Sequence, residues 1–274
     1  MEKIGWSSRR VAALLFPYDV FPSLNLSLSM NIIVWNSMGV LKPNFQNHVR
    51  ELARIHNPTI LVIMETRLGG ARAKEITNRL PFDDAIHTKT IGFTGGLWLL
   101  WNSDLVEVVH LANIEQEIHV EVKVLATNLS WIFSAVNASP RSIERCILWE
   151  NLIKVADLHN KPWVIAGDFN EPLLGEDKFG GRPVNISRSL LFKDCLDKCN
   201  MVDLCFSGPR YTWTNRREIN NLIQEIIDRY FMNPSWCLLY LNARVSHLIR
   251  CHSDHCPILL ETIPRKTTFL KRPF

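Results

Sequence analysis

A ten-residue stretch near the C-terminus, CHSDHCPILL at 251–260, carries the most reactive side chains of the chain. Two histidines, two cysteines and an aspartate precede a short apolar run, which leaves three interpretations: a zinc site, an acid–base pair, or a polar loop before a buried strand. A structural zinc site normally takes its ligands as two spaced pairs. Four ligands crowded into six residues fit that pattern poorly, and they are Cys251, His252, His255 and Cys256.

Polar side chains also stand at the ends of four apolar runs. Active sites favour such positions, because a rigid sheet can aim the ends of several strands into one cleft. If the four ends converge, the cleft holds carboxylates, carboxamides and an imidazole, which suit a hard cation such as Mg²⁺ or Mn²⁺. The residues are Asn36 after IIVW, Glu65 after LVIM, Asp168 and Asn170 after VIAG, and Asp254 with His255 before CPILL.

Each of these residues also has an interpretation without chemistry. Asp168 with Asn170, and Asn36 before Ser-Met-Gly, could form turns in which a side chain bonds its own backbone. Glu65 could be a capping or surface carboxylate. Asp228 could pair with the adjacent Arg229 as a solvated ion pair.

The elements that must position these residues alternate between strand and helix patterns. Nine apolar segments predict strands, and three amphipathic segments predict helices, so we expect one α/β domain of sheets covered by helices. The predicted strands are 31–36, 59–65, 95–101, 118–124, 129–136, 162–170, 210–215, 226–232 and 256–261. The predicted helices are 44–56, one that begins at Ser142, and one from Ser187 to about residue 200.

Composition narrows the class of protein. The chain has 274 residues, 47% hydrophobic and 21% charged, with a net charge of +4 and seven cysteines. The odd number and irregular spacing of the cysteines argue for a reducing compartment, so we expect an intracellular protein, nuclear or cytoplasmic. The mild positive charge is compatible with DNA. No segment reaches the roughly 20 apolar residues of a membrane span, and no obligate protein partner is evident.

Three regions are expected along the chain. Residues 1–29 are interpreted as a disordered N-terminal extension, because two prolines and two acidic residues argue against a targeting peptide. Residues 30–263 form the predicted domain. Residues 264–274 are basic and without periodicity, which indicates a truncated tail.

Five blocks in order carry a family resemblance: WNSMG (35–39), METRL (64–68), GDFN (167–170), IDRYF (227–231) and SDHCP (253–257). Over about residues 30–263 the chain resembles the endonuclease/exonuclease/phosphatase superfamily. NASPRS, GDFNEPL, YTWTN and CHSDHCPILLET look like the endonuclease domain of plant LINE-type (non-LTR) retrotransposon polyproteins. The resemblance implies a deoxyribonuclease-I-like fold: a four-layer sandwich of two packed, mainly antiparallel β-sheets flanked by helices.

The resemblance also implies roles for the strand-end residues. Glu65 would hold the metal, Mg²⁺ or Mn²⁺, with Asp254 as a second ligand. His255 would accept the proton of the attacking water, and Asp228 would orient its imidazole. The remaining members would position the nucleophile or donate hydrogen bonds to the phosphate: Asp168, Asn170 and Asn36.

Further residues could contact DNA. Trp213 could stack on or wedge between bases, although packing in the core explains most tryptophans. Arg141, Arg182, Arg216 and Arg217 could contact phosphates, or simply be solvated. Asn137 stands where the family usually has a tyrosine, and Ile226 where related elements often carry arginine; both departures put the activity in doubt.

The sequence therefore predicts a Mg²⁺-dependent phosphodiesterase that nicks DNA and derives from a LINE-type retrotransposon. Two alternatives remain open. One is a phosphatase that acts on small phosphoesters with the same fold. The other is a catalytically weakened relic that only binds DNA.

Overall fold

The computed structural model describes residues 29–88 and 95–263. The predicted extension at 1–29, apart from Ser29, and the predicted tail at 264–274 lie outside the described residues. Within the described ranges, no helix is both long enough and apolar enough to cross a membrane.

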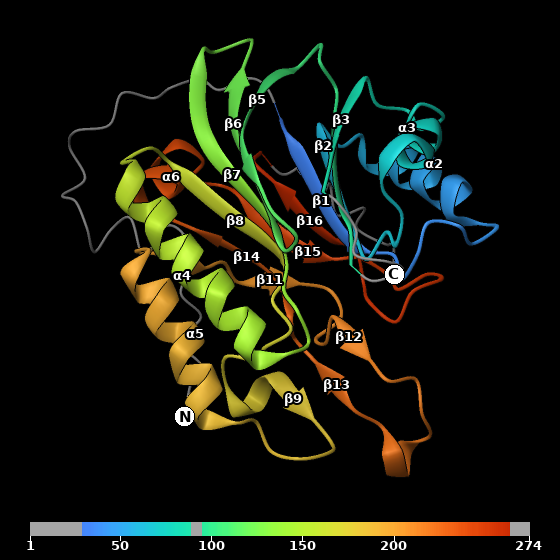
Figure 1. Ribbon diagram of the computed structural model, residues 1–274, viewed down its shortest axis with the longest axis vertical. Helices are drawn as coiled ribbons and strands as arrows, with labels where there is room; N and C mark the ends of the chain where they lie inside the picture. The colour runs from blue at the N-terminus through green and yellow to red at the C-terminus, as the bar shows by residue number, and fades with distance from the viewer. Residues whose placement is uncertain (1–28, 89–94, 264–274) are drawn as a thin grey trace, which may run out of the picture.

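Two large β-sheets form the centre of the molecule (Figure 1). In the seven-stranded sheet only the pairs β1–β2 and β11–β15 are parallel. Its order is β11 (Phe206–Ser207), β15 (Arg244–His247), β16 (Ile258–Glu261), β1 (Asn31–Asn36), β2 (Ile60–Met64), β4 (Leu97–Trp101) and β3 (Asp84–His87).

The second large sheet has six strands, and its only parallel pair is β7–β8. Its order is β10 (Val202–Asp203), β14 (Asp228–Met232), β8 (Trp163–Asp168), β7 (Leu129–Asn137), β6 (Glu117–Val124) and β5 (Val106–Asn113). A small antiparallel sheet lies beside these two, in the order β12 (Trp213–Thr214), β13 (Gln224–Glu225) and β9 (Lys178–Phe179).

Helices cover the outer faces of both large sheets (Figure 1). The helices α2 (Phe45–His56) and α3 (Gly70–Thr77) lie on the seven-stranded sheet, whereas α4 (Ser142–Leu158) and α5 (Ile186–Lys198) lie on the six-stranded sheet. The short helix α6 (Pro234–Leu239) follows β14. The predicted four-layer sandwich of mainly antiparallel sheets is confirmed.

Three layers of apolar side chains explain why the strands are continuous apolar runs in the sequence. In β1, Ile32 and Val34 point into the layer between the two sheets, whereas Ile33 and Trp35 point into the layer under α2 and α3. A third layer joins the six-stranded sheet to α4 and α5. Because successive side chains of a strand alternate in direction, a strand covered on both faces must be apolar throughout.

Most predicted elements are present with small shifts of their ends, and the fold also contains elements that the prediction omitted. The predicted strand 210–215 is reduced to the two residues of β12. Five α-helices lie in the described ranges instead of three, because α3 and α6 are short and carry little periodicity. A signal for α6 was present: Asn233 caps it and Pro234 occupies its first turn.

Gly167 lets β7 and β8 approach closely at the ends that carry polar residues. Its φ is +154°, and a Cβ at this position would lie 1.8 Å from the backbone oxygen of Val136 on β7. Glycine alone tolerates such an approach. The next pair in the register joins Asn137 to Asp168, so the glycine determines how closely these two residues are held.

We predict that Gly167→Ala lowers the free energy of unfolding by more than about 1 kcal/mol, because the added methyl group must push the two strands apart. Urea unfolding followed by circular dichroism measures the change. Gly175→Ala is the matched control, since a Cβ there meets no atom within 4 Å. Equal effects of the two substitutions would contradict this account of Gly167.

Candidate active site

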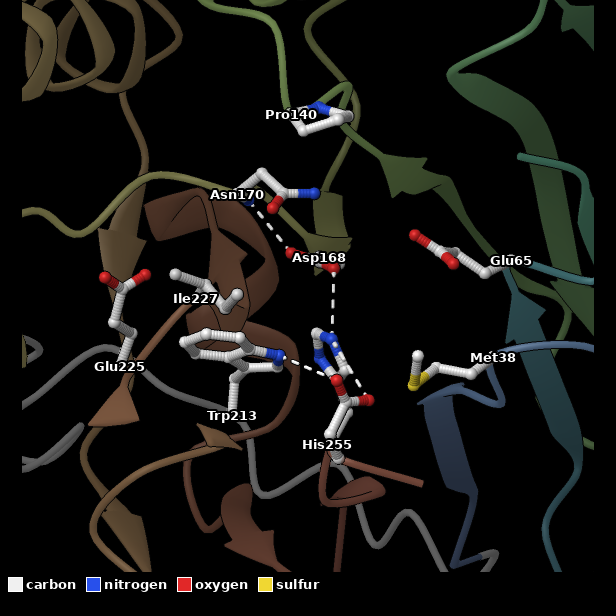
Figure 2. Close-up of a pocket in the computed structure, with 10 residues that line it drawn as sticks. Met38, Glu65, Pro140, Asp168, Asn170, Trp213, Glu225, Ile227 and His255 are labelled. Atoms are coloured by element: carbon white, nitrogen blue, oxygen red, sulfur yellow. Dashed lines mark hydrogen bonds and ion pairs between the residues drawn. The ribbon is translucent and has the colours of Figure 1, made fainter. Parts of the chain in front are cut away.

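Polar side chains from both large sheets meet in one cavity of about 190 Å³ (Figure 2). Asn36, at the end of β1, donates its Nδ2 hydrogen to Asp168 Oδ2, at the end of β8, over 3.1 Å. This bond joins the seven-stranded sheet to the six-stranded sheet. Ten residues line the cavity: Met38, Glu65, Pro140, Asp168, Asn170, Trp213, Glu225, Ile227, Asp254 and His255.

His255 is bonded to a carboxylate on one edge and faces two more on the other. Its Nδ1 lies 2.9 Å and 3.2 Å from the two carboxylate oxygens of Asp228. Its Nε2 lies 3.8 Å from Asp168 Oδ2 and 4.0 Å from Asp254 Oδ1. Because Asp228 accepts the Nδ1 hydrogen, the neutral imidazole keeps an unprotonated Nε2 toward the cavity.

The pKa values of this cluster follow from burial and from crowded negative charge. Burial opposes the charged imidazole, but the carboxylates of Asp228 and Asp168 outweigh it and raise the pKa of His255 to about 9. Burial, followed by the charge of Asp228, raises the pKa of Asp168 to about 7. Several acidic groups around one imidazole form an arrangement in which an added cation would be strongly stabilised.

Asn170 and Asn36 fit both interpretations, as turn-forming residues and as members of the active site. The backbone N–H of Asn170 donates to Asp168 Oδ1 over 2.9 Å, and its side chain donates to the oxygen of Ala138 over 2.7 Å. The residue has a φ of 49°, in the left-handed region that asparagine tolerates. Asn36 Oδ1 accepts from the N–H of Met38 over 3.1 Å. Both residues therefore form turns, and these turns hold Asp168.

Trp213 is bonded to the predicted metal ligand Asp254. The indole Nε1 donates to Asp254 Oδ2 over 3.0 Å, and the backbone N–H of Thr214 donates to the backbone oxygen of Asp254 over 3.1 Å. The ring is half-buried in the cavity wall, so it is neither a core residue nor a free surface aromatic. The tryptophan orients the carboxylate beside His255.

Glu65 opens into the same cavity as His255. It follows β2 directly with a φ of 50°, its side chain is 29% exposed, and Arg67 contacts its Oε2 over 3.1 Å. In Figure 2 Glu65 faces Asp168 from the side opposite to Glu225. Glu65 and Asp254 supply the carboxylate oxygens that a hard cation requires, and no cysteine is among the described residues that line the cavity. The donor set therefore fits Mg²⁺ or Mn²⁺.

Another set of donors lies closer together. Among the described residues, Asp168, Asp228 and His255 form the only group of three potential metal-binding side chains with ligand atoms within 4.8 Å of one another. Asp228 directs both of its oxygens at His255, so we assign it to the imidazole. The zinc quartet at 251–256 is not among such groups in the described part of the chain, and the zinc interpretation is wrong.

The alternative pairing of Asp228 with Arg229 is also wrong. Arg229 is buried and contacts Asp177 over 2.7 Å and also Asp203. The side chains of Asp228 and Arg229 alternate along β14, so they point to opposite faces of the sheet. Asp228 bonds His255 instead.

The other residues predicted to contact DNA lie outside the cavity wall. Asn137 is buried beside Asp168 and does not line the cavity. Arg141 is exposed and pairs with Glu144 over 2.9 Å. Ile226 is buried and points away from the cavity, whereas its neighbours Glu225 and Ile227 line it. Ile226 is therefore not part of the cavity wall.

Sequence reasoning missed part of the cavity. Met38, Pro140, Glu225 and Ile227 line it, and Arg67 contacts Glu65. The spacing of Glu225 and Ile227 was a usable signal. Residues two apart in an extended strand share one face, so these two side chains could have been predicted to line the same surface.

Comparison with known proteins identifies the family. The endonuclease/exonuclease/phosphatase family matches residues 33–255. No curated protein matches the chain.

Solved structures show the same fold at low sequence identity. The AP endonuclease LMAP from Leishmania major has a TM-score of 0.68 and 14% identity, over 86% of this chain and 88% of that one. The 3′ phosphatase NExo from Neisseria, bound to a product DNA hairpin, has a TM-score of 0.62 and 18% identity, over 84% and 98%. The endonuclease domain of TRAS1, a telomere-specific non-LTR retrotransposon, has a TM-score of 0.63 and 13% identity, over 85% and 98%.

The family match spans well over half of the chain, and the fold and the cavity agree with it. A hydrolase acting on phosphoester bonds is the class of enzyme that they support. The chain belongs to the endonuclease/exonuclease/phosphatase family.

Proposed function

We propose that the protein is a Mg²⁺- or Mn²⁺-dependent phosphodiesterase that nicks DNA, derived from the endonuclease domain of a LINE-type retrotransposon. One observation carries the proposal: an imidazole bonded to Asp228 opens into the same cavity as the carboxylates of Glu65 and Asp254. This combination matches the needs of hydrolysis, a base for water and a place for a cation.

His255 is the group that accepts a proton. Its Nε2 faces the cavity, and its Nδ1 hydrogen is held by Asp228, so a proton taken from water arrives at Nε2 and the positive charge is balanced by Asp228. Asp168 Oδ2 lies 3.8 Å from Nε2, so one water on the cavity side of the two groups could bond both. The water oxygen that loses this proton then attacks phosphorus, the bond from phosphorus to the 3′ oxygen breaks, and that oxygen takes up a proton, which leaves a 3′-hydroxyl and a 5′-phosphate.

Asn36 and Asn170 fix Asp168, and Asn170 also leaves a hydrogen-bond donor for substrate. A carboxamide carries two N–H donors. Asn170 lines the cavity and uses one of them on Ala138, whereas Asn36 is buried and donates to Asp168. Donors that are already in place need no reorganisation when charge develops on the phosphate oxygens.

Glu65 and Asp254 are the residues that would hold the cation, with Trp213 orienting Asp254. When bound, a divalent cation supplies positive charge to the phosphate oxygens and lowers the pKa of the neighbouring imidazole. The last effect matters because a base with a pKa near 9 would be protonated at neutral pH.

DNA is the substrate that most observations favour. Two proteins of similar fold are an AP endonuclease and a 3′ phosphatase bound to a product DNA hairpin. A third is a retrotransposon endonuclease domain, and the blocks NASPRS, GDFNEPL and YTWTN resemble plant members of that class.

The first test is nicking of supercoiled plasmid with Mg²⁺ and with EDTA. We predict metal-dependent nicking by the wild type and a rate about 10²–10⁴-fold lower in His255→Ala, because the general base is lost. His110→Ala is the control, since His110 is exposed on β5, outside the cavity. Binding of DNA without any metal-dependent nicking would instead identify a relic that only binds.

The second test separates Asp228 from His255. Asp228→Asn leaves an amide beside Nδ1, which can favour the tautomer with the hydrogen on Nε2, where it cannot accept a proton. We predict a nicking rate lower by about 10²-fold or more, and no further loss when this change is added to His255→Ala. Additive losses would show that Asp228 does not act through the imidazole.

The third test concerns the cation. We predict that Glu65→Gln weakens Mn²⁺ binding at least about tenfold, as measured by electron paramagnetic resonance, because one anionic ligand is lost. Glu75→Gln is the matched control: Glu75 also pairs with an arginine, Arg79, over 2.6 Å, but on the exposed surface of α3. Unchanged Mn²⁺ affinity in Glu65→Gln would remove Glu65 from the metal site.

A further inference from the structure

One side of the cavity carries a carboxylate that the proposed chemistry does not use. In Figure 2 Glu65 and Met38 lie on one side of Asp168 and His255, and Glu225 and Ile227 lie on the other. The first side holds the predicted metal ligand Glu65. The second side is where the rest of a substrate would lie when its phosphate occupies the cavity in front of Asp168 and His255, away from the predicted metal ligand.

The backbone fixes Glu225 in this position. In the small sheet Trp213 pairs directly with Glu225, and Glu225 pairs directly with Lys178. Trp213 also forms an isolated bridge with His255. Directly opposed residues of neighbouring strands lie on the same face, so one row of side chains runs from Lys178 through Glu225 and Trp213 to the catalytic histidine.

Lys178 holds the Glu225 carboxylate from behind. Its Nζ lies 2.5 Å from Glu225 Oε1, and both side chains are largely buried, with 19% of Lys178 and 17% of Glu225 exposed. Lys178 does not line the cavity, whereas Glu225 does. The ion pair therefore holds the glutamate in place, with its carboxylate and not the ammonium in the cavity wall.

The surface that results has a definite chemistry. Glu225 can only accept hydrogen bonds, and the adjacent Trp213 and Ile227 are apolar. Of the ten residues that line the cavity, all within the described part of the chain, none is a lysine or an arginine. A second phosphate on this side would meet the Glu225 carboxylate in the cavity wall, with the Lys178 ammonium behind it, whereas a flat ring with N–H or O–H donors would be accommodated.

We propose that Glu225 is a specificity-determining residue that admits an uncharged nucleoside unit next to the scissile phosphate and rejects a substrate with another phosphate there. The inference rests on the proposed function and narrows its substrate class. It separates a nuclease from a phosphatase of polyphosphorylated small molecules, because a second phosphate beside Glu225 would meet a group of like charge.

The test compares two substrates for each variant: a duplex oligonucleotide and inositol 1,4,5-trisphosphate, with Mg²⁺ throughout. Wild type should hydrolyse the oligonucleotide in large preference to the trisphosphate. Glu225→Gln should shift the ratio of the two kcat/KM values toward the trisphosphate by about tenfold, because one like-charge repulsion at close range is removed. Glu225→Asp keeps the charge and should keep the preference.

Glu107→Gln is the matched control, because Glu107 forms a cross-strand pair with Lys123 over 3.0 Å on β5 and β6, away from the cavity. Thermal unfolding and Mn²⁺ binding are measured for every variant. An unchanged substrate ratio in folded Glu225→Gln would overturn the inference, as would weaker Mn²⁺ binding, which would make Glu225 a metal ligand. Absence of hydrolysis of either substrate by wild type would refute the proposed function instead.

Discussion

The site depends on one interaction, the hydrogen bond between Asp228 and His255 inside a buried and strongly acidic junction. Asp228 ends up beside His255 because β14 places it next to Asp168 on β8, while β16 and the turn before it belong to the other sheet. The carboxylates that surround the imidazole repel one another, and a positive charge nearby relieves this repulsion. The protonation of His255 and the affinity for a cation are therefore linked properties of one cluster.

The packing of two sheets makes this cluster rigid. Side chains from both sheets fill one apolar layer, and outer layers under the helices hold each sheet from behind. Asn36 then connects the sheets directly through Asp168. Because the strands cannot move apart without exposing this layer, polar groups at their ends keep their distances.

A buried ion pair supports the loop above the cavity. Arg145, on α4, contacts Glu171 and donates to the backbone oxygens of Ser139 and Pro140 over 2.9 Å. Both charged side chains are almost fully buried. Glu171 directly follows the turn of Asn170, so the pair joins the turn that holds Asp168 to the loop that carries Pro140. Loss of either partner would leave an unpaired buried charge and strongly destabilise the fold, so the connection between the turn and the loop depends on both residues.

The layered α/β architecture could be predicted from the sequence, because apolar runs in β1, β2 and β8 require cover on both faces and α2, α4 and α5 supply it with buried residues at helical spacing. The sequence also indicated which strand ends carry reactive residues. It did not show whether Asp228 pairs with Arg229 or with His255, since Arg229 is adjacent in sequence and His255 is far away. Only the tertiary structure brought Trp213 to Asp254 and placed Glu225 on the cavity wall. The physical reason is that periodicity reports which face of a strand is buried, whereas a contact between residues far apart in the chain depends on how separate strands are registered and packed.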